Sequence, residues 1–230
     1  DRTNTVWVGD VKYKDISGPD GVPDGVIDDY DKTNIGSPMP KFTFGWTNTF
    51  RYKNFDLSVF INGSYGNKVY NYLSMKLTHM NSPWTNQLNA VNGRAQLVPI
   101  NPNKVYEDGT MWYNDVSNVM VANPGASIPR ATINDPNDND RISDRYIEDG
   151  SYIRLKNISL GYTFPKKTID KLGLSNLRIY ANIQNLLTIT GYDGYDPEIG
   201  ASTSSVNVYG LDNGRYPSPT VYSFGLNVSF

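Results

Sequence analysis

The chain has 230 residues, of which 19% are charged, and its 21 Lys and Arg nearly balance its 23 Asp and Glu to give a net charge of -2. That balance argues against a nucleic-acid-binding surface, which needs a basic face to neutralise phosphates, and the lack of cysteine excludes zinc fingers and thiol chemistry. The 17 Tyr, 8 Phe, 20 Gly and 14 Pro in a chain that is only 38% hydrophobic predict short strands joined by turns and long loops.

The chain opens on a polar segment and contains no run of about 18 apolar residues. We therefore expect neither a signal peptide in residues 1–4 nor a transmembrane helix. If the chain is exported, Asp1 is not the first residue of the whole protein, so we expect a fragment of a longer protein.

The first feature along the chain is an acidic loop over residues 15–31 that could bind calcium. In a calcium loop of the EF-hand type that starts at Asp20, carboxylates occupy positions 1, 5, 9 and 12, and Gly25 occupies position 6. Position 3 is Val22, which cannot bind a metal, and an alternative register takes Asp15 and Ser17 as the first ligands. A solvated acidic turn is the simpler interpretation. Any bound cation is expected to be a structural calcium, with these candidate ligands: Asp20, Asp24, Asp28 and Asp31.

Residues 41–53 and 55–65 predict two strands with a dyad pattern, joined by a tight turn at residues 53–54. Because side chains of a strand alternate between its faces, each strand has one apolar and one polar face, and the short turn makes them a hairpin. Phe60 is the single apolar residue on the polar side. The apolar parity contains Phe42, Phe44, Trp46, Phe50 and Tyr52 in the first strand and Phe55, Leu57, Val59, Ile61 and Tyr65 in the second.

A third and a fourth strand are predicted over residues 152–164 and 177–187, with a turn and a short helical piece between them. The second half of the third strand alternates well, but Ile153 and Leu155 fall on the opposite parity. A β-bulge near residues 156–157 would restore the phase. A strand that lies partly above a membrane is the other explanation.

The last strand, residues 222–230, has one parity that is entirely apolar or aromatic and another that is entirely small or polar. A strand of a soluble sandwich could show the same alternation. The chain, however, stops on the aromatic Phe230, which resembles the C-terminal signature of outer-membrane barrels. We therefore favour a barrel, with the apolar parity facing lipid and the polar parity facing the lumen.

Strand directions provide a second test of the barrel hypothesis. If residue 230 lies on the periplasmic side, the short connections 53–54 and 165–176 are also periplasmic, whereas the long segments 1–40, 66–150 and 188–218 are all extracellular. Transmembrane barrels have this asymmetry. Five strands, or seven if residues 66–150 hide a hairpin, cannot close a barrel, because the smallest need about eight. The remaining strands must come from other sequence.

Three blocks of sequence resemble the late part of SusC-like, TonB-dependent transporters of Bacteroidetes, the RagA/SusC family. Residues 9–15, 24–29 and 35–42 read GDVKYKD, DGVIDD and IGSPMPKF. Residues 145–162 read RYIEDGSYIRLKNISLGY, and residues 177–187 and 191–198 read LRIYANIQNLL and GYDGYDPE. The resemblance spans nearly the whole chain and departs from the family in residues 72–142.

The resemblance implies an all-β fold, in which residues 1–230 are the C-terminal strands of a large, about 22-stranded antiparallel transmembrane barrel with long extracellular loops. It also implies an outer-membrane location, a plug and earlier strands that this chain does not contain, TonB contact through the absent N-terminal part, and a SusD-like lipoprotein lid. The family imports glycans or peptides and needs no cofactor. We therefore expect an importer rather than an enzyme.

Aromatic side chains in the outer loops are the candidates for contact with cargo or lid. For any single one of them, packing between loops or an aromatic girdle at the membrane interface is the simpler interpretation. His79, the only histidine, lacks an accompanying G-x-S-x-G motif and is interpreted as a plain loop residue. The candidates are Trp84, Trp112, Tyr113, Tyr192 and Tyr195, followed by Tyr209 and Tyr216.

Two other hypotheses remain beside the importer. A secreted, calcium-stabilised β-sandwich that binds carbohydrate would bury its apolar parity and stay soluble, whereas a barrel exposes that parity. An outer-membrane enzyme would need a catalytic serine–histidine pair, which the sequence does not show. Carboxylates at residues 193–198 could suggest a glycosidase pair, but a turn explains them more simply.

Overall fold

The computed structural model describes residues 6–133, 135–198 and 209–230. Residues 1–4, and part of the 188–218 connection, therefore lie outside the described residues. The chain divides into two compact units. Unit 1 comprises Asp1–Ile35 and Leu73–Tyr146, and unit 2 comprises Gly36–Tyr72 and Ile147–Phe230.

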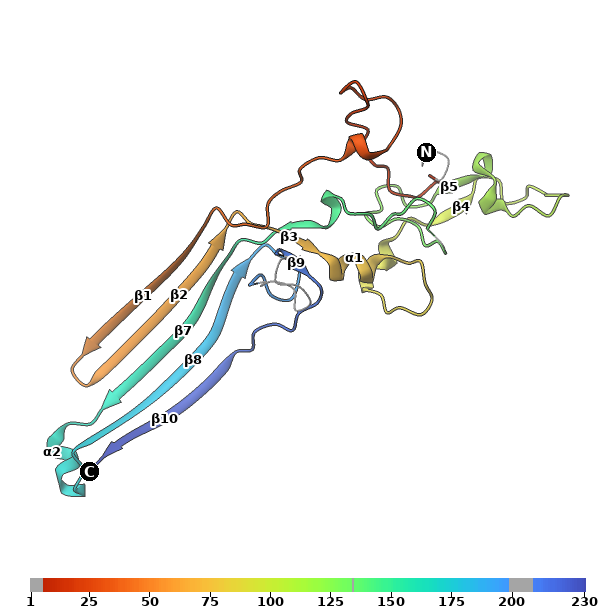
Figure 1. Ribbon diagram of the computed structural model, residues 1–230. Coiled ribbons are helices and arrows are strands. Elements are labelled where there is room, and N and C mark those ends of the chain that lie inside the picture. The colour runs from red at the N-terminus through yellow and green to blue at the C-terminus, as the bar shows by residue number, and fades with distance from the viewer. Residues whose placement is uncertain (1–5, 134, 199–208) are drawn as a thin grey trace. The chain divides into compact units, whose positions relative to one another are not determined.

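Unit 2 is built on one antiparallel sheet of five long strands in the order β1-β2-β7-β8-β10 (Figure 1). Each strand pairs with its predecessor among these five, as the alternating directions predicted. The tight turn is completed by Lys53, whose φ of 52° is left-handed. The bounds are β1 Phe42–Tyr52, β2 Phe55–Tyr65, β7 Tyr152–Thr163, β8 Asn176–Thr190 and β10 Val221–Ser229.

The predicted dyad pattern produces two chemically different faces of this sheet. Register partners such as Trp46 and Ile61, or Phe224 and Ala181, place the apolar parities of neighbouring strands on the same face. That apolar face is solvent-exposed: Trp46 retains 53% exposure and Phe224 retains 83%. On the other face, the exceptional Phe60 ring lies beside Gly45, where a Cβ atom would come within 3.3 Å of it.

The phase change predicted in the third strand is a β-bulge. In the pairing of β2 with β7, Phe60 lies opposite Asn157 and Ile61 lies opposite Leu155, so Lys156 is an extra residue. Leu155 consequently shares the apolar face with Ile61. The bulge prediction is therefore confirmed.

The ends of the sheet differ in their connections. At one end, α2 (Lys166–Ile169) and a 3₁₀ turn (Asp170–Leu172) connect β7 to β8, which confirms the helical piece expected there, and the C-terminus lies at the same end (Figure 1). Beyond the other end lies a small sheet in the order β6-β3-β9. Its strands are β3 Lys68–Asn71, β6 Ile147–Asp149 and β9 Leu211–Asp212.

Unit 1 contains little regular structure. The two further spanning strands that residues 66–150 could have contained are not β4 and β5, which pair antiparallel there but, with three residues each, are too short to span a membrane. The remaining elements among its described residues are one α-helix and five 3₁₀ turns. The bounds are α1 Tyr72–Thr78, β4 Leu97–Pro99, β5 Val119–Val121, and 3₁₀ turns Asp29–Asp31, Asn89–Gly93, Trp112–Asn114, Val116–Asn118 and Asp144–Tyr146.

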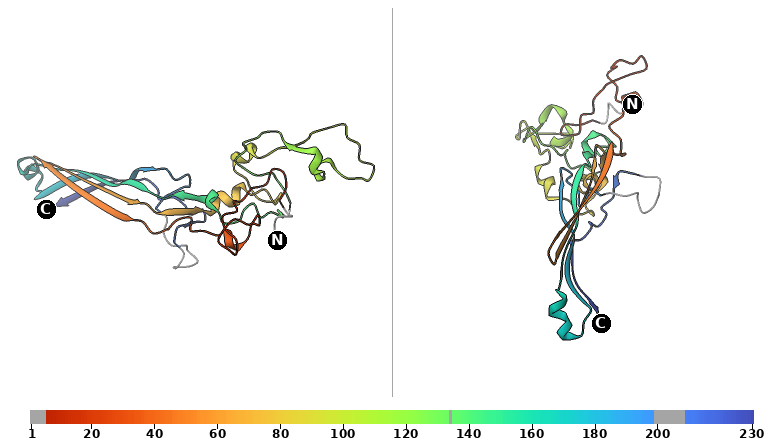
Figure 2. Two further views of the ribbon diagram at one scale, coloured as in Figure 1. Left: turned by 90° about the horizontal axis from the view of Figure 1, so that it is seen from above. Right: turned by 90° about the vertical axis from the view of Figure 1, so that its left-hand side faces the viewer.

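The buried apolar residues lie outside the five-stranded sheet. In the described part of unit 2 they are Val69, Ile169 and Tyr192, none of which is on a long strand. The sheet is thus a single layer, and no described residue of unit 2 forms a second layer on its apolar face (Figure 2). Across the described residues, no helix combines the length and the apolar character that crossing a bilayer requires.

Candidate functional site

The polar face of the sheet carries a charged pair in a space left by a glycine. Arg178 of β8 donates to both carboxylate oxygens of Asp56 on β2, at 2.6 and 3.1 Å. Gly161 lies between them on β7, and a Cβ atom there would come within 2.3 Å of the guanidinium. A bidentate pair of this kind fixes both side chains across three strands. We name it the polar-face ion pair.

A second charged cluster lies where the bulge turns β7. Arg154 is 3% exposed, and its guanidinium donates to Thr188 Oγ1 at 2.8 Å, to Glu198 Oε2 at 2.6 Å and to Asp196. Lys156 donates to the same Glu198 oxygen at 2.6 Å. Arg154 and Lys156 of β7 thus hold two carboxylates, Asp196 and Glu198, of the loop that follows β8. We name this group the Arg154 latch.

Further hydrogen bonds hold the loop that follows β8 in place. Asp196 accepts hydrogen bonds from the backbone amides of Ser218, at 3.0 Å, and Glu198, at 2.9 Å. Burial alone would raise the pKa of Asp196, but these amides and the Arg154 guanidinium outweigh burial and hold that pKa below its usual value. Tyr192 donates to Asp212, and burial together with this hydrogen bond raises the pKa of Tyr192 well above its usual value.

A cavity of about 590 Å³ opens beside the Arg154 latch within unit 2. Its volume is within the range of small-molecule sites. Charged, hydroxyl and aromatic groups line it together, so it can offer hydrogen bonds and aromatic contact to a polar ligand. Lining residues include Met39, Thr43, Lys156, Glu198, Tyr209 and Arg215.

The aromatic residues predicted as contact sites fall in several places. Tyr209 lines the cavity, whereas Tyr192 is buried against Asp212. Tyr195 and Tyr216 are exposed at 64% and 84%. In unit 1, Trp84 is 92% exposed, and the rings of Trp112 and Tyr113 contact each other with centroids 5.7 Å apart.

The acidic loop of unit 1 is held mainly by its own backbone. Asp31 accepts from the amides of Ile16, Ser17 and Asp28, at 2.7, 3.2 and 2.9 Å, and these hydrogen bonds lower the pKa of Asp31. Asp28 caps the short 3₁₀ turn, Asp24 accepts from the amide of Val26 at 2.9 Å, and Asp15 accepts from the amide of Gly25 at 2.6 Å. Asp20 lies on the exposed rim of the loop. Calcium binding by this loop stays a prediction.

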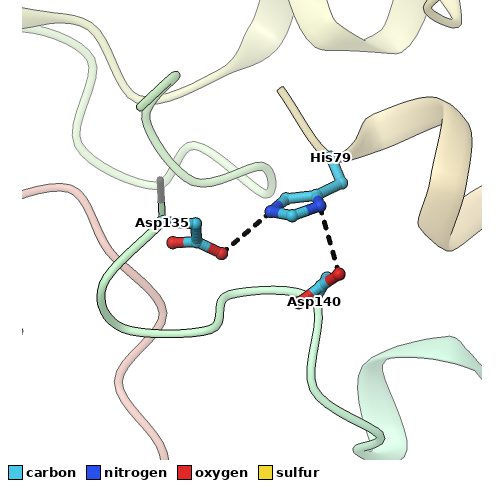
Figure 3. A group of neighbouring side chains, drawn as sticks. All are labelled: His79, Asp135 and Asp140. Atoms are coloured by element: carbon cyan, nitrogen blue, oxygen red, sulfur yellow. Dashed lines mark hydrogen bonds and ion pairs between the residues drawn. The ribbon is translucent and has the colours of Figure 1, made fainter. Parts of the chain in front are cut away.

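The sequence does not predict the surroundings of His79. The pattern indicates a plain loop residue, whereas the structure buries it at 9% exposure between Asp135 and Asp140 (Figure 3). Arg154 also escapes prediction, because it looks like an ordinary polar-face residue until the loop folds back on it. For His79, the one signal in the sequence is the density of Asp and Asn in residues 135–140, which contain both of its partners.

No family model matches the chain, but individual proteins do. TonB-dependent receptor P3 of Formosa agariphila is 34% identical over 223 residues, covering 95% of this chain and 19% of that protein. TonB-dependent receptor SusC of Bacteroides thetaiotaomicron is 29% identical over 209 residues, covering 90% of this chain and 17% of that protein. The chain therefore spans about a fifth of the length of these relatives.

Solved structures show the same fold. The RagAB peptide importer in its closed-closed state matches 93% of this chain and 20% of its own with a TM-score of 0.63. The open-open state matches 100% of this chain and 21% of its own with a TM-score of 0.60, and both are 20% identical in sequence. These comparisons confirm the predicted resemblance to SusC-like TonB-dependent receptors and the all-β, antiparallel fold. They do not favour the secreted sandwich.

Proposed function

We propose that this chain forms wall strands and outer loops of a TonB-dependent, SusC-like importer in the bacterial outer membrane, and that it has no chemistry of its own. The observation that carries the proposal is the five-stranded layer whose apolar face is exposed while its opposite face holds ion pairs. The relatives named as TonB-dependent receptors support the same conclusion.

The dimensions of the apolar face suit a bilayer. Aromatic rings lie at both of its ends. Near the α2 end, the ring centroids of Phe55 and Tyr162 are 4.7 Å apart, and at the other end those of Phe42 and Tyr65 are 5.4 Å apart. Ten residue steps from Phe55 to Tyr65 span about 34 Å along the strand. A strand tilt of about 40° reduces this to about 26 Å of height, close to the apolar band of outer-membrane barrels.

The same proposal extends to the parts of the transporter that this chain does not contain. Residues 1–230 correspond to the C-terminal part of the barrel, and a longer protein supplies the plug, the earlier strands and the contact with TonB. A SusD-like lipoprotein forms the lid. Support comes from the RagAB structures, which are described as those of a peptide importer, and from the SusC relative.

The cargo in this proposal is a glycan or a peptide, and the cavity beside the Arg154 latch contributes to contact with it. Among the predicted contact residues, Tyr209 is the one that lines the cavity, and Tyr216 is a matched exposed tyrosine outside that lining. Replacing Tyr209 with alanine should lower uptake, whereas replacing Tyr216 should not. Uptake of labelled oligopeptides and oligosaccharides by cells distinguishes the two cargo classes.

The decisive experiment is to extract outer membranes in mild detergent, purify the protein without boiling and identify all co-migrating chains by mass spectrometry. We expect a plug-bearing barrel sequence together with a lipoprotein. Recovery of the chain alone as a folded monomer in the soluble fraction would overturn the proposal.

A further inference from the structure

A buried histidine in unit 1 lies between two carboxylates that come from a distant part of the chain. His79 directly follows α1, and Nε2 of its ring lies 2.8 Å from Asp135 Oδ2, a residue 56 positions later. The other ring nitrogen, Nδ1, lies 3.1 Å from Asp140 Oδ2 (Figure 3). Both nitrogens of one ring therefore face an anionic oxygen.

Asp135 is the more rigidly held of the two carboxylates. It is 5% exposed, and it accepts hydrogen bonds from the backbone amide and the side-chain amide of Asn139, both at 2.6 Å. The Asp135 carboxylate is therefore a fixed acceptor. We place a proton on Nε2 of His79, which donates it in a hydrogen bond to Asp135. The 2.8 Å separation is a hydrogen-bond distance.

This assignment leaves the lone pair of Nδ1 directed at Asp140. A lone pair and a carboxylate oxygen 3.1 Å apart repel each other unless a cation lies between them. The neighbouring arginines have other contacts: Arg130 pairs with Asp10 at 2.8 Å, Arg141 donates to the Asn137 carbonyl at 2.7 Å, and Arg145 lies over the Tyr146 ring. Among the described residues, no ion pair joins any of these three arginines to Asp140.

We propose that His79 Nδ1 and Asp140 Oδ2 bind a divalent transition metal of the Zn²⁺ class. Tetrahedral zinc with ligands at about 2.0–2.1 Å places two ligand atoms about 3.3 Å apart, so the observed 3.1 Å needs an adjustment of a few tenths of an ångström. Asp135 then orients the ring through the opposite nitrogen, as a carboxylate behind a metal-bound histidine does.

Two further features fit a metal at this place. The Asp140 side chain retains 29% exposure, so water can reach the ion and fill the remaining coordination positions. A nitrogen ligand favours zinc, copper or nickel over calcium, which takes oxygen ligands. This site is therefore chemically distinct from the acidic loop at residues 15–31. A bound ion would tie the end of α1 to residues 135–140.

The test uses the full-length protein in detergent, purified without a polyhistidine tag, stripped of metal and kept in millimolar Ca²⁺ so that oxygen-only sites are filled. Zn²⁺ is titrated by calorimetry and Co²⁺ by visible absorption. The wild-type protein should show a site that Asp140→Asn weakens at least about 10-fold. Asp135→Asn should weaken it about 10- to 100-fold by loosening the ring. Asp138→Asn, a change of the same type in the same turn, should leave binding unchanged.

Wild-type binding itself keeps the proposal falsifiable if a variant misfolds. Absence of Zn²⁺ and Co²⁺ binding by the wild-type protein would overturn the proposal, and so would wild-type binding that a folded Asp140→Asn variant retains in full. In that case the ring would carry a proton on each nitrogen, and nuclear magnetic resonance would show a doubly protonated imidazolium. Neither result depends on transport, because the measurement involves only metal and protein.

Discussion

Replacing Arg154 with methionine tests whether the Arg154 latch holds the outer loop. Methionine keeps most of the length of the side chain and removes its charge and donors. The Arg154 side chain is 4% exposed, and the change leaves Asp196, whose side chain is 10% exposed, without its cation. Breaking a buried ion pair by removing one partner costs about 3–5 kcal/mol. We expect that cost to appear as local opening of the loop.

A neighbouring cation provides the matched control. Lys156 bonds the same Glu198 oxygen, but their side chains are 31% and 33% exposed, and such pairs contribute about 1 kcal/mol or less. The amide of Ser218, which donates to Asp196, is the reporter for hydrogen exchange measured by mass spectrometry. At about 1.36 kcal/mol per tenfold change, Arg154→Met should accelerate its exchange at least about 100-fold and Lys156→Met about 5-fold or less. Equal effects of the two variants would refute the reasoning.

The same reporter gives a pH dependence with a defined sign. The pKa of Asp196 lies below its usual 3.8, so its pairing stabilises the folded loop fully above that pH and is lost as pH falls through the lower folded value. After correction for intrinsic exchange, protection of the Ser218 amide should stay constant from about pH 7 to pH 5 and fall only below about pH 4. Loss of protection between pH 7 and pH 5 would contradict the assigned pairing.

Three further predictions concern the sheet and the acidic loop. Gly161→Val should displace the polar-face ion pair and lower stability by about 1–3 kcal/mol in thermal unfolding, whereas Gly191→Val, where a Cβ meets nothing within 4 Å, should be nearly neutral. Trp46→Lys on the apolar face should cost about 2–4 kcal/mol and reduce the assembled fraction in outer membranes, while Thr47→Lys on the polar face should assemble normally. If the acidic loop binds calcium, millimolar Ca²⁺ should slow proteolysis of residues 15–31 in the wild-type protein but not in Asp31→Asn; equal protection of both would exclude that site.

The long strands were predictable because their signal is local. An alternation of period two needs only neighbouring residues, and it gave β2 its bounds of Phe55–Tyr65 directly. The bulge was predictable for the same reason, because Ile153 and Leu155 were out of phase with the rest of their strand. The predicted end of the fourth strand, Leu187, falls short of the observed end, because Thr188 and Thr190 extend β8 beyond its apolar run.

The charged clusters could not be predicted, because each depends on residues far apart in sequence. Arg154 lies 42 positions before Asp196, and His79 lies 56 positions before Asp135. Nothing in the neighbourhood of either basic residue specifies its partner. The aromatic loop residues show the same limit: composition marked Tyr192 and Tyr209 as equivalent, but only the fold buries one and places the other at a cavity.

The bulge in β7 lets the strand keep its apolar residues on the apolar face and also present Lys156 to Glu198 of the outer loop. Deleting Lys156 tests these two roles separately. Because Lys156 is the extra residue between Leu155 and Asn157, deleting it makes the pairing with β2 regular and keeps the other β7 side chains on their present faces relative to β2. The pairing with β8 is already shifted at this point, and there the deletion adds one residue to the mismatch. Deleting Thr47 from β1, which has no bulge, moves half of that strand to the opposite face. We therefore expect the protein without Lys156 to assemble in outer membranes, although with a weakened latch, and the protein without Thr47 to fail. Failure of both deletions would show that the bulge itself is required for assembly, and that Lys156 does more in the barrel wall than present a cation to the loop.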